Sequence, residues 1–378
     1  MREPDLSCIQ CGTIYKFALL GACSCGGTLF VRYDLDAISK LWTPDAFAAR
    51  PHTMWRYREL LPVRDAGCIV SLGEGWTALT ELHARQHKLN VRRIRIKREG
   101  YNPTGSFKAR GMSCAVSLLR EWGVERAVLA SNGNAAAALA AYAAKTNISA
   151  TVFLPGDCPN ATIRDCRQYG AEVFVVAGWI HDAGAAAQRY CDQHGGFNLG
   201  TLREPGRVEG KKTMGFEIAE QSGWKLPDAI VYPTGGGSGL IGMWKAFQEL
   251  REMGLVEGDM PRLYCVQITG CDPIVHALAD DHGLRAFEPD TRVSHTGVRV
   301  PYPPNADLLV NILRDTGGSA TRVDELEVAA ALQQLQAWNI LCSHEGGAAW
   351  AGLLRLYETG VLNARDDVVV FQTAQKTL

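Results

Sequence analysis

Short apolar runs alternate with longer amphipathic stretches over most of this chain, beginning near Ile94. The short runs have the length and composition of buried strands, and the longer stretches have apolar residues at helical spacing. The expected strands are residues 94–96, 127–130, 150–154, 173–176, 229–232, 263–268 and 368–371. The expected helices are residues 107–122, 135–145, 161–169, 182–193, 240–251, 324–338 and 347–357. This alternation is typical of βαβ units, so we predict an α/β fold with parallel sheets.

The length of the chain, 378 residues of which 47% are hydrophobic, allows two domains and a small appendage. Because the expected strands fall into two groups, we predict two open parallel-sheet α/β domains. We assign residues 31–102 and 210–378 to a large domain and residues 103–209 to a small one. Between residues 31 and 70, large apolar side chains recur at spacings that indicate helical packing. A cleft between two such domains is the expected place for a ligand.

The charge balance argues against nucleic acid as a partner, because 39 Lys and Arg residues oppose 40 Asp and Glu residues. Membrane insertion is not expected either, since no apolar run approaches the roughly 20 residues needed to cross a bilayer. The sequence Met1–Ser7 is polar and lacks the pattern of a signal peptide. We therefore expect a cytoplasmic protein.

Four of the twelve cysteines are clustered near the N-terminus, at Cys8, Cys11, Cys23 and Cys25. Glycines follow both pairs and let the backbone turn around the thiolates, so that four sulfurs can complete a tetrahedral zinc shell. We predict a structural zinc site in a zinc-ribbon-like segment, residues 1–30. The Cys-x-Cys spacing of the second pair is tighter than usual, and a metal-free cysteine-rich segment is the alternative. The other eight cysteines are scattered and are interpreted as reduced core residues.

The stretch from Asn102 to Gly111 follows an expected strand and opens an expected helix. Its Pro, Thr, Gly and Ser residues predict a turn and a helix cap, which put Lys108 in the first helical turn. The helix dipole disfavours a charged lysine there, and desolvation would favour the neutral amine further. A neutral amine can attack an aldehyde to form an imine. An exposed surface lysine is the alternative.

Two more loops lie between an expected strand and an expected helix. In Thr234-Gly-Gly-Gly-Ser-Gly239, consecutive backbone N–H groups can converge on a phosphate monoester. The amide side chains of Ser131-Asn-Gly-Asn134 can reach a ring hydroxyl or a carboxylate. A plain glycine turn and a simple helix N-cap are the respective alternatives. All three loops follow the carboxyl ends of strands, where ligands of open α/β sheets bind.

Taken together, these segments resemble the fold-type II pyridoxal-phosphate (PLP) enzymes, and most closely the threonine synthase family. The resemblance covers most of the chain after residue 70, with the same order and spacing of motifs. It rests on Gly73-Glu-Gly-Trp-Thr-Ala-Leu79, the Lys108 motif, Ser131–Asn134, Arg207-Val-Glu-Gly-Lys-Lys-Thr213, the glycine loop and Thr373. Some relatives also carry an N-terminal zinc-ribbon-like segment. The resemblance implies that PLP is the cofactor and that the large domain binds it.

The resemblance also implies roles for individual residues. Lys108 would hold PLP as a Schiff base and later move protons, and Asn134 would bond the ring hydroxyl of the cofactor. The phosphate cup would consist of Gly235, Gly236, Gly237, Ser238 and Gly239. Thr373 would present a hydroxyl to the pyridine nitrogen, which makes the ring a milder electron sink. The substrate would be bound by Thr77, Ser131, Asn132, Gly133 and Arg207. Of these residues, Arg207 would bind the phosphate group of the substrate.

One position and one short stretch depart from the threonine synthase pattern. Ala109 stands where an aspartate is common, and Lys-Ala-Arg-Gly is more similar to threonine and serine dehydratases. Thr201-Leu-Arg-Glu204 replaces polar residues that help to bind the substrate phosphate. An acid at position 204 would repel phosphate if it pointed inward, although Arg203 could compensate. These departures bear on the substrate and not on the cofactor.

The resemblance implies conversion of O-phospho-L-homoserine and water to L-threonine and phosphate, with Lys108 moving protons between the α and β carbons. One alternative is a threonine or serine dehydratase, or another β-elimination or β-replacement enzyme. Another is a catalytically silent PLP-binding or zinc-ribbon adaptor. The expected partner is a small amino-acid substrate, and relatives suggest a homodimer.

Overall fold

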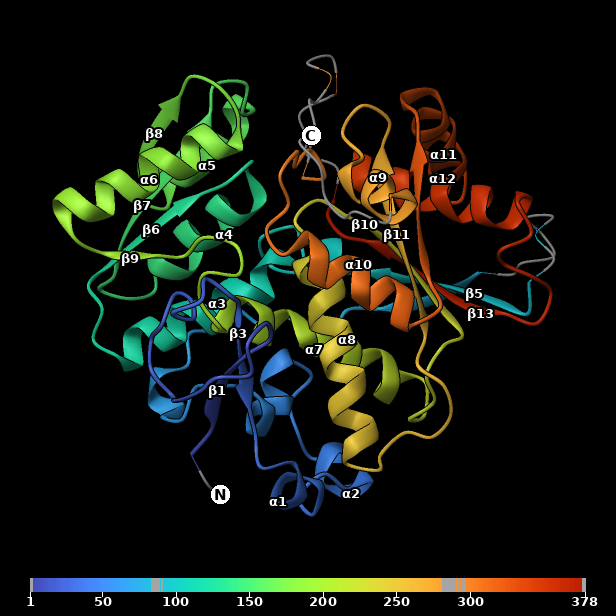
Figure 1. Ribbon diagram of the computed structural model, residues 1–378, viewed down its shortest axis with the longest axis horizontal. Helices are drawn as coiled ribbons and strands as arrows, with labels where there is room; N and C mark the ends of the chain where they lie inside the picture. The colour runs from blue at the N-terminus through green and yellow to red at the C-terminus, as the bar shows by residue number, and fades with distance from the viewer. Residues whose placement is uncertain are drawn as a thin grey trace. The chain divides into compact units, whose positions relative to one another are not determined.

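A computed structural model of the chain describes residues 3–82, 89, 91–280, 290, 293 and 297–375. The chain forms two compact units, and Figure 1 follows it from blue to red through both. The first unit comprises residues 1–76, 108–214 and 249–255, and the second comprises residues 77–107, 215–248 and 256–378. Residues 31–76 thus lie in the first unit, whereas the sequence-based division grouped residues 31–102 with the C-terminal part.

The N-terminal segment is a three-stranded antiparallel sheet, which we call the ribbon (residues 5–32). Its strands are β1 (Asp5–Cys8), β2 (Ile14–Lys16) and β3 (Leu29–Arg32), in the order β2-β1-β3. Leu6, Leu29 and Val31 are buried together with Cys8 and Cys23. So small an apolar cluster cannot stabilise a sheet of this size without further support.

Four short helices follow the ribbon: α1 (Leu35–Ser39), α2 (Pro44–Ala48) and the 3-10 helices η1 (Met54–Leu60) and η2 (Ala66–Cys68). The expected helical packing is confirmed at Trp42, Phe47, Trp55 and Leu60, which are buried, whereas Leu41 is 46% exposed. Trp55 packs in one cluster with residues of helix α3 (Lys108–Glu121). That packing explains why this segment belongs to the first unit.

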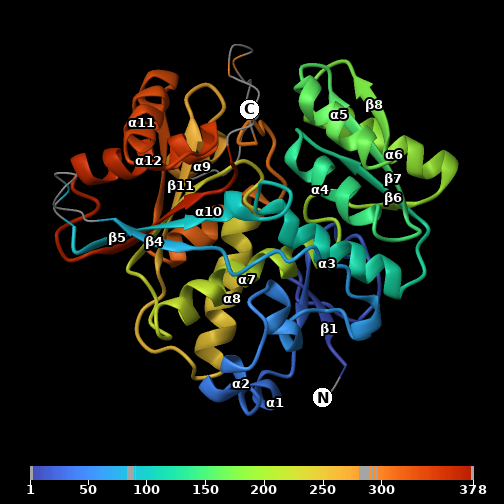
Figure 2. The same cartoon turned by 180° about the vertical axis from the view of Figure 1, so that it is seen from behind.

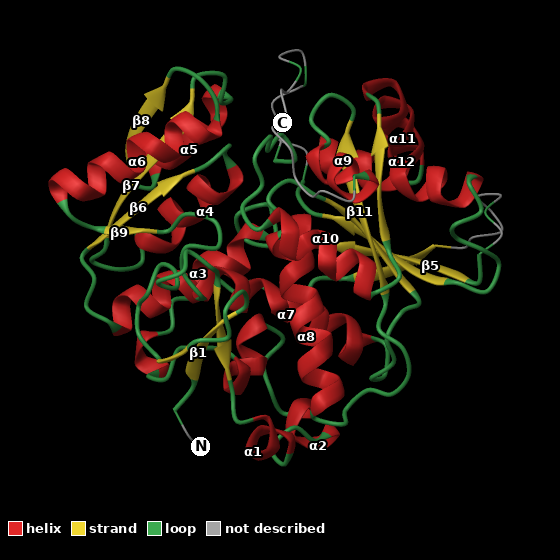
Figure 3. Cartoon of the chain, viewed as in Figure 1, coloured by secondary structure: helices red, strands yellow, loops and turns green. Residues whose placement is uncertain are grey.

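The first unit contains a parallel sheet with the strand order β8-β7-β6-β9. Its strands are β6 (Arg126–Ala130), β7 (Ser149–Pro155), β8 (Glu172–Val176) and β9 (Phe197–Asn198). The connecting helices are α3, α4 (Asn134–Ala143), α5 (Asn160–Gln168) and α6 (Ile180–His194). Ala127 and Leu129 pack toward α3 and α4, and Val128 between them packs toward α6. Because successive side chains of a strand point to opposite faces of the sheet, helices cover both faces (Figure 3).

The second unit contains a six-stranded sheet in the order β12-β11-β10-β13-β5-β4, with β4 antiparallel to β5 and the other pairs parallel. Its strands are β4 (Leu79–Leu82), β5 (Arg93–Arg98), β10 (Ala229–Pro233), β11 (Arg262–Ile268), β12 (Ser319–Val323) and β13 (Asp367–Gln372). Its helices include α8 (Ser238–Glu252), α9 (Pro273–Ala279), α10 (Ala306–Asp315), α11 (Glu325–Ala337) and α12 (His344–Glu358). Helices α11 and α12 bury one face of the sheet, and Figure 2 shows this unit from behind.

All seven expected strands and all seven expected helices are confirmed as elements, with ends that shift by a few residues. The sequence reasoning missed strands β4, β9 and β12 and helices α9 and α10, as well as helix α7 (Gly206–Gln221). This helix is almost entirely buried, yet it carries Arg207, Glu209, Lys211, Lys212 and Glu217, so it has no apolar periodicity to detect. Among the described residues, no helix has both the length and the apolar composition to span a membrane.

Candidate active site

Lys108 is the first residue of α3, as predicted from the turn residues before it. Asn102 shapes this turn by donating from Nδ2 to the backbone oxygen and to Oε2 of Glu99, at 2.8 and 2.9 Å. Gly105 has a φ of 70° and donates to Asn102 O at 2.8 Å, which closes the turn. The amine of Lys108 therefore extends from a fixed point at a helix N-terminus.

The segment before Lys108 is attached to the end of β13. Phe107 N donates to Thr373 O at 3.0 Å, and Ser106 forms an isolated bridge with Ala374. Gln375 N donates to Gly105 O at 2.9 Å. Thr373 itself is buried, with 4% of its surface exposed. The hydrogen-bonded backbone therefore joins Thr373 to the residue that directly precedes Lys108.

The glycine loop connects the carboxyl end of β10 to the first residue of α8, Ser238. A Cβ at Gly235 would lie 2.5 Å from Gly297 O, and one at Gly239 would lie 2.2 Å from the hydroxyl oxygen of Tyr232. Gly237 has a φ of 73° and would clash with Leu309. Only glycine satisfies these positions, and the resulting row of backbone N–H groups at a 15-residue helix suits a phosphate.

Glu345 supports this loop from helix α12. Its Oε1 accepts a hydrogen bond from Gly297 N at 2.7 Å, and the carbonyl of the same Gly297 faces Gly235. The neighbouring His344 pairs with Glu325, at 2.6 Å between Nε2 and Oε2. The backbone partner of Glu345, Gly297, is 48 residues away in the sequence and could not be predicted.

The segment Ser131–Gly133 lies between β6 and α4, as predicted, and Asn134 is the first residue of α4. Ser131 Oγ accepts from Gly133 N at 3.0 Å and from Ala136 N at 3.2 Å, so this hydroxyl serves as a helix cap. Gly133 has a φ of 142°, which other residues rarely adopt. Asn132 is half-buried, and Asn134 is exposed. The loop thus presents the amide side chains while Ser131 holds its shape.

Arg207 is in the first turn of α7 and is 2% exposed. Its Nη1 donates to Leu199 O, directly after β9, whereas its buried Nε has no hydrogen-bond partner. Burial lowers the pKa of the guanidinium, and Glu204 acts in the opposite direction. An orphaned N–H on a buried cation fits an anionic ligand.

Glu204 turns back onto the start of α7. Its carboxylate accepts from Arg207 N at 2.9 and 3.1 Å, and burial raises its pKa to about 7, against the effect of Arg207. Arg203, the residue considered able to compensate for Glu204, is exposed and donates to Gln188 Oε1 at 3.3 Å. Ala109 is fully buried in the core of the first unit.

Thr77 is buried, and its Oγ1 donates to Glu99 Oε1 at 2.6 Å. Just before it, the fully buried Glu74 accepts from Trp55 Nε1 at 2.9 Å, from Ser113 Oγ at 2.6 Å and from Tyr142 OH at 2.6 Å. Sequence reasoning identified the Gly73–Leu79 motif but missed this hub. An acid between two glycines is the local signal, although the three side chains that donate to it come from distant segments.

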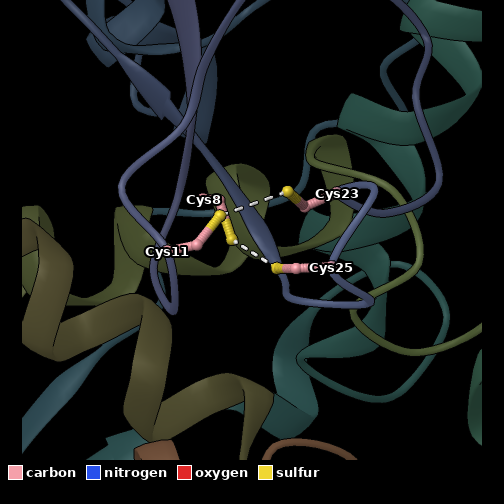
Figure 4. Close-up of side chains that lie close together, drawn as sticks. All are labelled: Cys8, Cys11, Cys23 and Cys25. Carbon is pink, nitrogen blue, oxygen red and sulfur yellow. Dashed lines mark hydrogen bonds between the residues drawn. The ribbon is translucent and has the colours of Figure 1, made fainter.

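The four clustered cysteines are brought together, as Figure 4 shows. Their Sγ atoms all lie within 4.8 Å of one another, with 3.5 Å between Cys8 and Cys25 and 3.6 Å between Cys11 and Cys23. A tetrahedral zinc with bonds of about 2.3 Å separates its sulfurs by about 3.8 Å. A Cβ at Gly27 would lie 2.6 Å from Cys8 Sγ, so the glycine makes room for the sulfurs. The donor set can hold a structural zinc.

The predicted site residues are divided between the two units. Lys108, Ser131, Asn132, Gly133, Asn134 and Arg207 belong to the first unit, and Thr77, the glycine loop and Thr373 belong to the second. The chain crosses from the second unit to the first at the Phe107–Lys108 bond.

Comparisons with known proteins give a consistent picture. The family described as pyridoxal-phosphate dependent enzyme matches residues 70–373. Threonine synthase of Methanocaldococcus jannaschii is 33% identical over 372 residues, covering 97% of this chain and 91% of that protein. Threonine synthase of Methanosarcina acetivorans is 34% identical over 369 residues, covering 97% of this chain and 89% of that protein.

Solved structures share the fold at lower identity. Maize serine racemase superimposes with a TM-score of 0.69 at 19% identity, covering 80% of this chain and 88% of that chain. The processed form of threonine deaminase isoform 2 from Solanum lycopersicum gives a TM-score of 0.66 at 23% identity, covering 80% of each chain. These likenesses establish the architecture of the fold.

Proposed function

Since the chain belongs to the pyridoxal-phosphate dependent enzymes and, within them, to the threonine synthases, we propose that it converts O-phospho-L-homoserine and water to L-threonine and phosphate. The observation that carries this proposal is identity above 30% over 97% of the chain. The chain is a PLP-dependent lyase. The dehydratase and adaptor alternatives have no comparable support, because the deaminase and racemase structures agree with it in fold alone.

The residues present fit the cofactor. We propose that Lys108 binds PLP covalently, that Asn134 bonds its ring hydroxyl and that Thr373 faces its ring nitrogen. Residues Gly235 to Gly239 would bind its phosphate, and the clashes that exclude other residues at Gly235, Gly237 and Gly239 support this role. When bound, PLP supplies an electron sink for a carbanion at the substrate.

The protein's own groups would then position the substrate and move protons. Lys108 Nζ carries a proton between the α and β carbons. The loop of Ser131, Asn132 and Gly133 binds the substrate carboxylate, and Thr77 contributes to the substrate site. Arg207 Nε, buried without a partner, donates to the substrate phosphate. Phosphate departs from the γ carbon, and water adds at the β carbon.

Glu204 does not oppose this proposal. Its carboxylate is directed to the backbone N–H of Arg207 and lies at the start of α7. With its pKa raised to about 7, it is partly protonated near neutral pH and repels a phosphate less than an ordinary carboxylate would. Glu204 thus shapes the first turn that carries Arg207.

We further propose a homodimer located in the cytoplasm. The dimer is the usual state of fold-type II relatives, and a biosynthetic activity suits the cytoplasm. Light scattering of the purified protein measures the oligomeric state directly.

Product analysis tests the activity. The purified PLP-loaded protein is mixed with O-phosphohomoserine, and free phosphate and threonine are assayed together, with threonine and serine as parallel substrates. Equal amounts of phosphate and threonine support the proposal. Release of ammonia and an oxoacid from threonine or serine, with phosphohomoserine unchanged, would reassign the chain to the dehydratases.

A further inference from the structure

Lys211 is a buried basic residue that the proposed mechanism does not use. It lies on α7 and is 1% exposed. It follows Arg207 by one helical turn, and residues four apart on a helix share a face. Arg207 and Lys211 therefore lie on the same side of α7.

That side of α7 packs against the beginning of α3. A Cβ at Gly111 would lie 2.9 Å from Arg207 O and 3.0 Å from Lys211 Cε. A Cβ at Gly210 would lie 2.2 Å from Arg110 O, so a glycine on each helix allows the close approach. Gly111 is three residues after Lys108 and shares a face of α3 with it. The packing thus brings the Lys211 side chain to the turn of α3 that begins with Lys108.

The charges of this region are predominantly positive. Burial lowers the pKa of Lys211 well below its usual value, and both Arg207 and Lys108 lower it further, while Glu204 acts in the opposite direction. Three basic side chains are thus close enough to repel one another. Burial raises the pKa of Glu204, the acid that acts on Lys211 in the opposite direction, to about 7. A buried cation is costly unless an anion accompanies it.

We propose that Lys211 is a second cationic ligand of the substrate's phosphate group, beside Arg207, and that it makes the enzyme select phosphorylated amino acids. This inference rests on the proposed function and extends it. A guanidinium supplies directed N–H groups, and an ammonium adds a compact charge to the same oxyanion. A purely structural lysine at this position would gain nothing from a phosphate.

Lys211→Met, Lys211→Arg and the exposed-site control Lys225→Met test the proposal. Methionine has a similar length and suits a buried position. We expect Lys211→Met to raise the KM for O-phosphohomoserine and the inhibition constant of inorganic phosphate roughly 10- to 100-fold. The value of kcat and the absorption band of lysine-bound PLP should change little. Lys211→Arg should recover most of the loss, and Lys225→Met should resemble the wild type.

Direct titration with inorganic phosphate, followed by calorimetry on the PLP-loaded proteins, separates this inference from the proposed function. If the wild type binds phosphate and Lys211→Met binds it at least about tenfold more weakly, the inference holds even when phosphohomoserine is not turned over. Equal phosphate binding by the two proteins would overturn it. Loss of the PLP band, or of kcat at unchanged KM, in Lys211→Met would also overturn it, by assigning Lys211 to the cofactor or to proton transfer.

Discussion

The carboxyl group of Glu204 is the clearest case in which one buried side chain sets a property of the protein. Its pKa is raised by burial from 4.5 to about 7, so between these pH values the folded state holds a proton that the unfolded state releases. Stability therefore falls as pH rises through this window, and the contribution of the neutral carboxyl is complete only below pH 4.5.

Glu204→Gln removes this titration while keeping an oxygen that can accept from Arg207 N. Relative to the variant, we expect the wild type to lose on the order of 1–3 kcal/mol of unfolding free energy between about pH 5 and pH 8. Urea unfolding at both pH values measures the difference. The exposed-site control Glu257→Gln should follow the wild type, and a constant difference between wild type and Glu204→Gln would contradict the prediction.

Lys108 is the residue on which the cofactor assignment depends. Lys108→Ala should abolish the absorption band of lysine-bound PLP and lower turnover by several orders of magnitude. The substitution removes the lysine amine at the start of helix α3. Spectra of the PLP-saturated variant and of the exposed-site control Lys145→Ala provide the measurement. A band that persists unchanged in Lys108→Ala would move the assignment to another lysine.

At the scale of elements, the ribbon and helix α7 are joined by a buried ionic network. Tyr33, directly after β3, donates to Glu209 Oε2 at 2.8 Å, and its ring lies 4.2 Å from Lys212 Nζ. Lys212 also pairs with Glu249 at 2.8 Å. Glu209 and Lys212 are on α7, within the same turns as Arg207 and Lys211. The folding of the ribbon is therefore linked, through these contacts, to helix α7, which is proposed to bind the substrate phosphate.

Loss of metal from the ribbon should consequently destabilise the first unit. We expect one zinc per chain, and we expect Cys8→Ser to lose it and to lower Tm by roughly 2–4 °C for each kcal/mol lost. Elemental analysis and calorimetry measure both effects. Cys191→Ser, outside the cluster, is the control. A zinc-free protein as isolated, with an unchanged Tm in Cys8→Ser, would favour the metal-free alternative.

At the scale of the whole molecule, the proposed cofactor ligands are divided between the two units. Because a ligand stabilises whatever it binds, by about 2.7 kcal/mol at a hundredfold excess over Kd, PLP should stabilise both units. Hydrogen exchange of the apo and PLP-loaded forms should show slower exchange at residues 131–134 and at residues 235–239 in the loaded form. Protection confined to one of these loops would show that the other has been assigned wrongly.

The sequence by itself determined the features that depend on neighbouring residues. The strand and helix rhythm follows from local apolar periodicity, and the Lys108 turn, the glycine loop and the cysteine pairs are short motifs with their own backbone chemistry. The family follows from the same motifs. The fold class and cofactor could therefore be predicted before any contact was known.

Only the tertiary structure decided the features that depend on distant partners. Helix α7 escaped detection because its buried surface is charged, and two of its charged residues have distant partners: Glu209 accepts from Tyr33, and Lys212 pairs with Glu249. The grouping of residues 31–76 with the first unit was set in the same way. The physical reason is that burial and charge compensation depend on which segments pack together. The local periodicity of the sequence does not show which segments these are.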